Sequence, residues 1–75
     1  MMTAGLYRLT SATLAVVLVN GRHIAHILPI GSTVKIIDKS INGNQLVNVE
    51  VGELLALMFS QDLRTRAEKI EEMRA

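Results

Sequence analysis

The sequence predicts a mainly β fold, a small antiparallel barrel of five strands closed by a C-terminal α-helix. Three observations lead to this prediction. Residues 13–28 read as two strands around a tight turn, further short apolar runs are separated by turn residues, and helix-forming residues replace β-forming ones after Ser60. A chain of 75 residues is long enough for one domain only, so residues 1–75 are expected to form a single unit.

The first two predicted strands, residues 13–19 and 22–28, are rich in β-branched side chains. Asn20 and Gly21 lie between them and favour a type I′ turn, because both residue types tolerate a positive φ. This turn sets the register, which places Val19 opposite Arg22. One face then carries Leu14, Val16, Leu18, Ala25 and Ile27, and the other carries Ala15, Val17, Val19 and Ile24. Since both faces are apolar, we expect the hairpin to be covered on both sides or to lie in a subunit interface.

Three more strands are predicted after the break at Pro29. Apolar residues alternate with Lys35 and indicate a third strand, which ends in the polar loop of residues 38–44. Residues 46–51 place three valines on one face, as expected for a half-buried fourth strand. A reversal then leads into a fifth strand, residues 53–59.

Residues 60–74 predict the C-terminal helix. Ser60 is a favourable N-cap residue, and Asp62 places a negative charge in the first turn, where it suits the helix dipole. Apolar residues recur at spacings of four and three, namely Leu63, Ala67, Ile70 and Met73. We expect this stripe to pack on the barrel of its own chain; the alternative is that it packs on a second subunit or another protein partner.

The composition favours a homo-oligomer. Apolar residues make up 49% of the chain, and without cysteine neither disulfides nor cysteine-bound zinc can stabilise it. A chain of this size buries only about 60% of the surface that it exposes when unfolded. We therefore expect apolar side chains to be buried between subunits, in a dimer or a tetramer. The candidate interface residues are Leu14, Val16, Val17, Val19, Ile24, Leu63 and Ile70.

The charge balance does not indicate a nucleic-acid-binding protein, since eight Lys or Arg residues stand against seven Asp or Glu. Two aromatic residues, Tyr7 and Phe59, are also too few for a base-stacking platform. The alternative interpretation, a small RNA- or DNA-binding regulator, therefore depends on local phosphate contacts. The candidate contact residues are Arg8, Arg22, Arg64 and Arg66.

No apolar run reaches the roughly 18 residues of a membrane-spanning helix, so we expect no contact with a membrane. Arg8 and the stretch of residues 9–19 loosely resemble a secretion signal. Thr10, Ser11 and Thr13 interrupt its apolar region, however, and no small-residue cleavage motif follows. In the absence of cysteine, the expected location is the cytoplasm.

No catalytic, cofactor-binding or metal-binding constellation is recognisable. His23 and His26 are three residues apart, and on a strand they point to opposite faces, so they cannot bind one metal ion together. No serine lies in a nucleophile-elbow motif, and no glycine-rich turn has the lysine of a phosphate-binding loop. The leading interpretation is a non-catalytic binding and assembly module. A third alternative is an enzyme whose site forms at the symmetry axis of an oligomer.

Parts of the sequence resemble three known groups of proteins. Residues 29–36 and 46–63 are similar in pattern to the strand order of SH3-like barrels, which implies an SH3-like fold. The aromatic groove with which peptide-binding SH3 domains hold polyproline ligands is not matched. Residues 7–10, 13–15, 58–59 and 62–64, together with Arg66, resemble short bacterial proteins of uncharacterised function, and this likeness implies no activity.

The third resemblance is to small translational regulators of the carbon-storage type, which bind RNA as dimers. It is carried by Gly31, Val34 and Ile36 together with residues 43–46 and the terminal helix. Those regulators present clustered arginines near their strand ends. Here only Arg8 and the pair formed by Arg64 and Arg66 could correspond to them.

Overall fold

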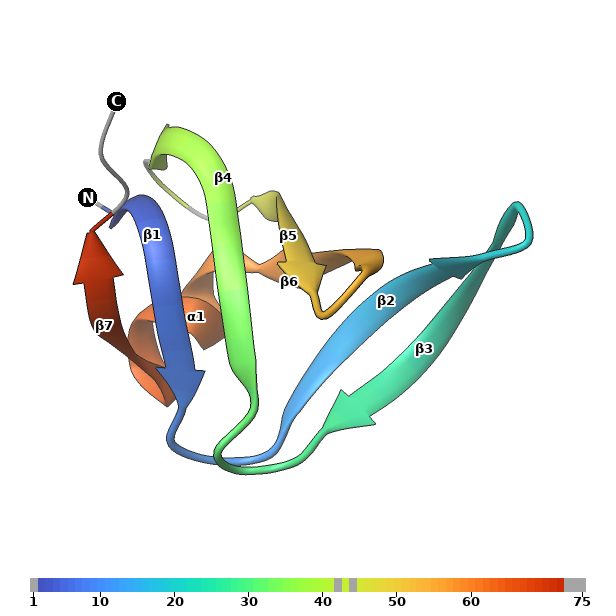
Figure 1. Cartoon of the computed structure of the whole chain (residues 1–75), viewed down its shortest axis with the longest axis horizontal. Helices are drawn as coiled ribbons and strands as arrows, with labels where there is room; N and C mark the ends of the chain where they lie inside the picture. Colours follow the sequence, from blue (N-terminus) through green and yellow to red (C-terminus); the bar gives the residue numbers. More distant parts are fainter. Residues whose placement is uncertain (1, 42, 44, 73–75) are drawn as a thin grey trace.

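The computed structural model describes residues 2–41, 43 and 45–72, which form seven strands and one short helix. In chain order these are β1 (Met2–Leu9), β2 (Thr13–Val19), β3 (Arg22–Leu28), β4 (Thr33–Ile41), β5 (Leu46–Val51), β6 (Leu54–Phe59), α1 (Ser60–Arg66) and β7 (Ala67–Glu72). All strands belong to one antiparallel sheet with the order β3-β2-β6-β5-β4-β1-β7. The sheet curls strongly, and β2 and β3 extend away from the rest as a long hairpin (Figure 1).

The predicted hairpin and its register are confirmed. Val19 pairs with Arg22, and the ladder continues without a break to the pair of Thr13 and Leu28. The turn residues have the conformation that a type I′ turn requires, with φ of 49° at Asn20 and 77° at Gly21. The two strands are therefore joined by local chemistry that is visible in the sequence.

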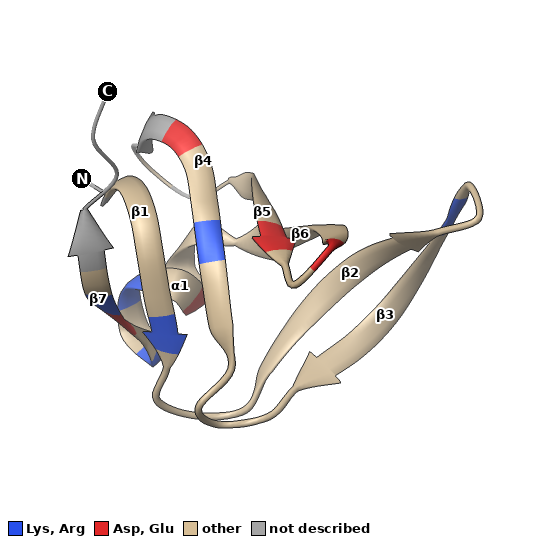
Figure 2. Cartoon of the chain, viewed as in Figure 1, with Lys and Arg blue, Asp and Glu red and all other residues tan. Residues whose placement is uncertain are grey.

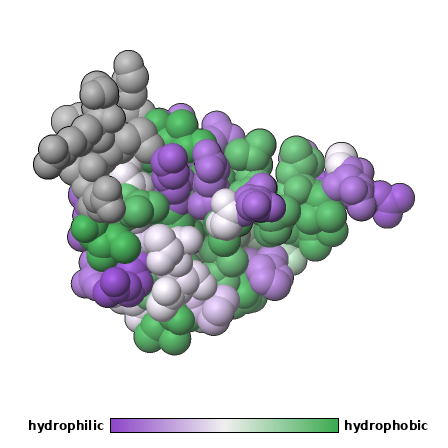
Figure 3. Space-filling view, viewed as in Figure 1, coloured by the Kyte–Doolittle hydropathy of each residue, from purple (hydrophilic) through white to green (hydrophobic). Residues whose placement is uncertain are grey.

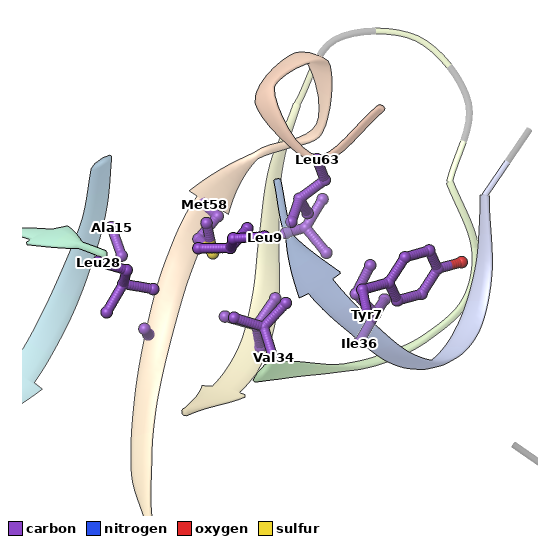
Figure 4. Packing of buried hydrophobic residues seen from close by; sticks show 11 residues of the cluster. Tyr7, Leu9, Ala15, Leu28, Val34, Ile36, Met58 and Leu63 are labelled. Carbon is purple, nitrogen blue, oxygen red and sulfur yellow. The ribbon is translucent and has the colours of Figure 1, made fainter. Parts of the chain in front are cut away.

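The core lies on the inner face of the curled sheet and is closed at one end by α1 (Figure 4). Its buried side chains are Tyr7, Leu9, Ala15, Leu28, Val34, Ile36, Val47, Val49, Ala56, Met58 and Leu63. Most of them alternate along their strands with exposed residues, as the period of two requires. The predicted burial of Val47 and Val49 on one face of β5 is confirmed.

The prediction of five strands in a closed barrel is wrong in two respects. The sheet has seven strands, two more than predicted, because residues 2–9 (β1) and 67–72 (β7) also form strands. The sheet is open, with β3 and β7 at its two edges. Residues 2–9 become a strand because β1 pairs with β4 on one side and β7 on the other, while Tyr7 and Leu9 enter the core. These pairings join distant segments, so they leave little trace in the local sequence.

The predicted helix over residues 60–74 is also wrong beyond Arg66. The backbone becomes extended at Ala67, with φ of −139° and ψ of 151°, and β7 pairs with β1. Two side-chain contacts support this pairing: an Arg8–Glu68 ion pair of 3.6 Å, and the Lys69 ammonium group 5.7 Å from the centre of the Tyr7 ring. Tertiary pairing thus outweighs the helix propensity of the segment. Met73, the last residue of the predicted stripe, lies outside the described residues.

Ser60 does not act as the N-cap that the sequence indicates. The N-cap residue is Phe59, and no side chain caps the helix. The Ser60 hydroxyl group instead accepts a hydrogen bond of 2.9 Å from the Gln45 amide and donates one of 2.9 Å to the Gly43 carbonyl. It is fully buried, and it ties the start of α1 to the connection between β4 and β5.

Candidate functional site

The β2–β3 hairpin, which we call the arm, carries many apolar residues but contributes few of them to the core. It comprises residues 13–28 and extends away from the curled body (Figure 1). Every residue of β3 except Leu28 is exposed, and β3 forms one edge of the sheet. The arm therefore presents two faces and an open edge.

The outer face of the arm, which is turned away from the core, is aliphatic except for His23. It consists of Leu14, Val16 and Leu18 on β2 and of His23, Ala25 and Ile27 on β3. Leu14 and Leu18 are exposed, Val16 is half-buried, and the Ile27 side chain remains 58% exposed. A solvent-facing strand usually carries polar residues on this side, so the pattern is unusual for a surface that stays in water.

The outer face continues from the arm onto β6. Val16 pairs with Leu57, which brings the outward-facing residues of β6 beside those of β2. Leu55 and Phe59 are each two residues from Leu57 and therefore share its face, and both are about half exposed. The aliphatic surface thus spans at least β3, β2 and β6, which makes it a contiguous patch and not a set of scattered residues.

The inner face of the arm is covered only near its base. Ala15 and Val17 are buried against the core, as neighbours of β6. Towards the turn, Val19 and Ile24 extend past the core and are exposed, as is Leu54 at the start of β6. The distal half of the arm is therefore apolar and exposed on both faces.

Charged residues are almost excluded from the arm. Between residues 13 and 28 the only Lys, Arg, Asp or Glu is Arg22, next to the turn (Figure 2). The hydropathy view shows the same division, with hydrophobic side chains along the arm and hydrophilic ones at its tip (Figure 3). Burial of the arm against another apolar surface would leave Arg22 at the rim, where it can stay hydrated.

Most of the predicted interface residues lie on the arm, namely Leu14, Val16, Val17, Val19 and Ile24. Leu63 does not, because it is fully buried in the core of its own chain. Ile70 is exposed on β7, at the opposite edge of the sheet. The helical stripe that grouped these two residues does not exist, since only Leu63 belongs to α1.

The interface prediction also left out residues that the structure places on the outer face. These are Leu18, Ile27, Leu55 and Phe59. Leu18 and Ile27 could have been included, because the period of two places both with Leu14 and Val16. Nothing local to the sequence shows that β6 lies beside β2.

The four candidate nucleic-acid contacts are not brought together. Arg22 lies at the tip of the arm, away from the other three. Arg8 forms its ion pair with Glu68, and Arg66 donates a hydrogen bond of 3.1 Å to the Ala12 carbonyl. Arg64, on α1, is half-buried. The four candidates therefore do not form one cluster, because Arg22 is separate from the others.

The two histidines lie on opposite faces of β3, as predicted, since His23 pairs with Leu18 and His26 with Ala15. Within the described residues, no group of three or more His, Cys, Asp or Glu side chains could hold a metal ion. In the part of the chain that the structure describes, no helix is both long enough and apolar enough to cross a lipid bilayer.

No known protein family, curated protein sequence or solved structure matches this chain.

Proposed function

We propose that this protein is a non-catalytic assembly module whose copies associate through the arm. The observation that carries the proposal is the exposure of aliphatic side chains on both faces of the distal arm and along its outer face. Transfer of a fully exposed aliphatic side chain into a protein interior is worth about 1.5–3 kcal/mol. The exposed aliphatic side chains of the arm are already partly buried, so each can contribute only part of this amount to a complex. Several of them together can exceed the cost of association.

The proposal is supported by what the arm contributes to its own chain. Only Thr13, Ala15, Val17 and Leu28 of the hairpin are buried. Among the described strands, β3 pairs only with β2, and its exposed aliphatic residues are not part of the buried core cluster. A surface that is apolar without serving the core is typical of an interaction site.

A matched pair of substitutions tests the proposal. Ile27→Asp places a charge on the outer face of the arm, whereas Ile30→Asp places the same charge in the turn after Pro29, at an even more exposed isoleucine. We expect Ile27→Asp to lower the native mass to that of one chain and Ile30→Asp to leave it unchanged, as measured by light scattering after size exclusion. Equal masses for the wild type and both variants would refute association through the arm.

We also propose that the curled sheet is of the SH3-like type. This assignment is supported by the three-stranded meander of β4, β5 and β6, followed by one short helix and a last strand that returns to β1. In this arrangement the arm is a long insertion between β1 and β4. Tyr7 is buried and Phe59 lies on the outer face, so polyproline recognition is not part of the proposal.

A small RNA- or DNA-binding regulator remains the competing hypothesis. It requires the predicted contact residues to reach phosphates; these are Arg8 on β1, Arg22 on β3, and Arg64 and Arg66 on α1. Binding of this kind weakens steeply with salt. A fluorescence titration with mixed oligonucleotides at low salt would support it if binding is seen and disappears in Arg64→Gln; a flat titration would eliminate it.

A further inference from the structure

We propose that β3 pairs edge to edge with β3 of a second copy, antiparallel and around a two-fold axis through Ala25, so that two sheets become one. This inference rests on the proposed self-association and specifies its geometry. It follows from a comparison of the two edges of the sheet, from the backbone groups that β3 leaves unpaired, and from the register that satisfies them.

The two edges of the sheet differ in their protection against pairing. β7 carries Glu68, Lys69, Glu71 and Glu72 among its six residues, and its ladder with β1 is interrupted by a register shift. Charges and bulges of this kind prevent edge strands from adding a further strand.

The β3 edge has none of this protection along its length. It contains no Lys, Asp, Glu or Pro, and its single charge, Arg22, is the first residue of the strand. The β2–β3 ladder is regular from end to end. A long, regular edge strand whose only charged residue is at one end is a template for a further strand.

The two-residue turn determines which backbone groups of β3 are free. In such a hairpin the residues that flank the turn form a hydrogen-bonded pair, and hydrogen-bonded and non-bonded pairs then alternate. Arg22, Ile24, His26 and Leu28 therefore direct their N–H and C=O groups to β2. His23, Ala25 and Ile27 direct theirs to the open edge.

One register satisfies all of these free groups. With Ala25 opposite Ala25 of the second copy, His23 lies opposite Ile27 of that copy and Ile27 opposite its His23. Each of these three pairs can exchange two hydrogen bonds. Registers centred on Ile24 or His26 pair only two of the three outward-facing residues, and Pro29, which has no N–H, prevents extension at the base of the arm.

The same register matches side chains of compatible chemistry. A two-fold axis perpendicular to the sheet keeps the outer faces on one side, so the aliphatic rows of both arms join across Ala25. Arg22 lies opposite Leu28 of the second copy, and the two arginines are at opposite ends of the paired strands. No like charges face each other across the new ladder.

Cysteine cross-linking tests the register, because the chain has no cysteine of its own. Ala25→Cys places two thiols opposite each other, where the Cα atoms of a hydrogen-bonded pair are about 5.5 Å apart and a disulfide can form. The matched control is His23→Cys on the same edge. In the proposed register its two copies are displaced by four residues, or about 13 Å, beyond the reach of a disulfide.

We expect Ala25→Cys to form a covalent dimer under mild oxidation and His23→Cys to remain uncross-linked. A mixture of His23→Cys and Ile27→Cys chains should cross-link as a heterodimer. Efficient cross-linking of His23→Cys alone, or none at position 25 at concentrations where the wild type is associated, would overturn the register.

Ala25→Pro provides a second test that does not depend on disulfide geometry. Proline removes an N–H group that β2 does not use, and an edge strand tolerates it there. We expect this variant to keep its strand content by circular dichroism and to have the mass of one chain. If it stays associated while Ile27→Asp is monomeric, edge pairing is wrong and association through the faces of the arm stands. A wild type that is monomeric throughout would refute both.

Discussion

At the scale of single residues, Ser60 is a polar side chain that the fold places in its interior. Its hydroxyl group is fully buried and links two backbone groups, the Gln45 amide and the Gly43 carbonyl. A buried donor or acceptor that loses its partner costs about 1–3 kcal/mol of stability.

We therefore expect Ser60→Ala to lower the free energy of unfolding by about 1–3 kcal/mol, because both backbone groups lose their partner. Urea denaturation followed by circular dichroism measures this change. Ser32→Ala is the control, since the Ser32 hydroxyl group donates to the Pro29 carbonyl at a site closer to solvent. If both variants have the same stability, the Ser60 bridge contributes nothing.

The arm also shows what residue-level reasoning can and cannot predict. The alternation of β2 correctly separated Val17 from Leu18, but both faces are apolar, so the sequence does not show which face the core covers. That choice depends on β6, which lies nearly forty residues further along the chain. The predicted interface therefore combined buried Val17 with exposed neighbours.

At the scale of elements, residues 60–72 form the short helix α1 followed by the strand β7, where the sequence predicts one continuous helix. Leu63 is fully buried, whereas Ile70 on β7 is 41% exposed. A continuous helix would have placed both on one apolar stripe and made both important for packing.

The structure predicts unequal costs for the two truncations. Leu63→Ala should lower the free energy of unfolding by about 2–5 kcal/mol, because it leaves a cavity in the core. Ile70→Ala should cost at most about 1 kcal/mol, since much of its side chain is already in water. Thermal or urea unfolding of the two variants measures these costs. Comparable losses in the free energy of unfolding would contradict the β7 strand and favour a continuous helix with one apolar stripe.

The turn of the arm is the element that local sequence specifies best. Gly21 has a φ of 77° and open space around the position where a Cβ would be, so Gly21→Ala tests backbone strain alone. A left-handed conformation costs a non-glycine residue about 1–2 kcal/mol. We expect faster amide hydrogen exchange in the distal arm of Gly21→Ala than in the control, Gly21→Asn, since asparagine tolerates this conformation better. Unchanged exchange in both variants would show that the turn does not hold the register.

The success with the hairpin and the failure with β1 and β7 have the same origin. An Asn-Gly turn between two β-rich runs encodes its pairing within sixteen residues. The β1–β7 ladder joins residues about sixty positions apart, and residues 67–72 are good helix formers without it. Local propensity is therefore informative only where the pairing is local.

At the scale of the whole molecule, the open sheet is the main departure from the predicted barrel and the origin of the functional proposal. A closed barrel has no edges, but this sheet ends in β3 and β7. Charges protect β7, while β3 lies at the end of an aliphatic arm. The composition indicates more apolar side chains than the core of one chain takes up, and many are indeed exposed. The composition does not show where they lie, because their location depends on the order of the strands.

The central claim is self-association through the arm, and the absolute mass of the wild-type protein tests it most directly. Light scattering after size exclusion, with concentration from refractive index because the chain has one Tyr and no Trp, should be recorded over a dilution series together with absorbance at 260 nm. We predict a multiple of 8.2 kDa that falls towards one chain on dilution, without excess absorbance at 260 nm. A constant mass of 8.2 kDa at every concentration would contradict the claim.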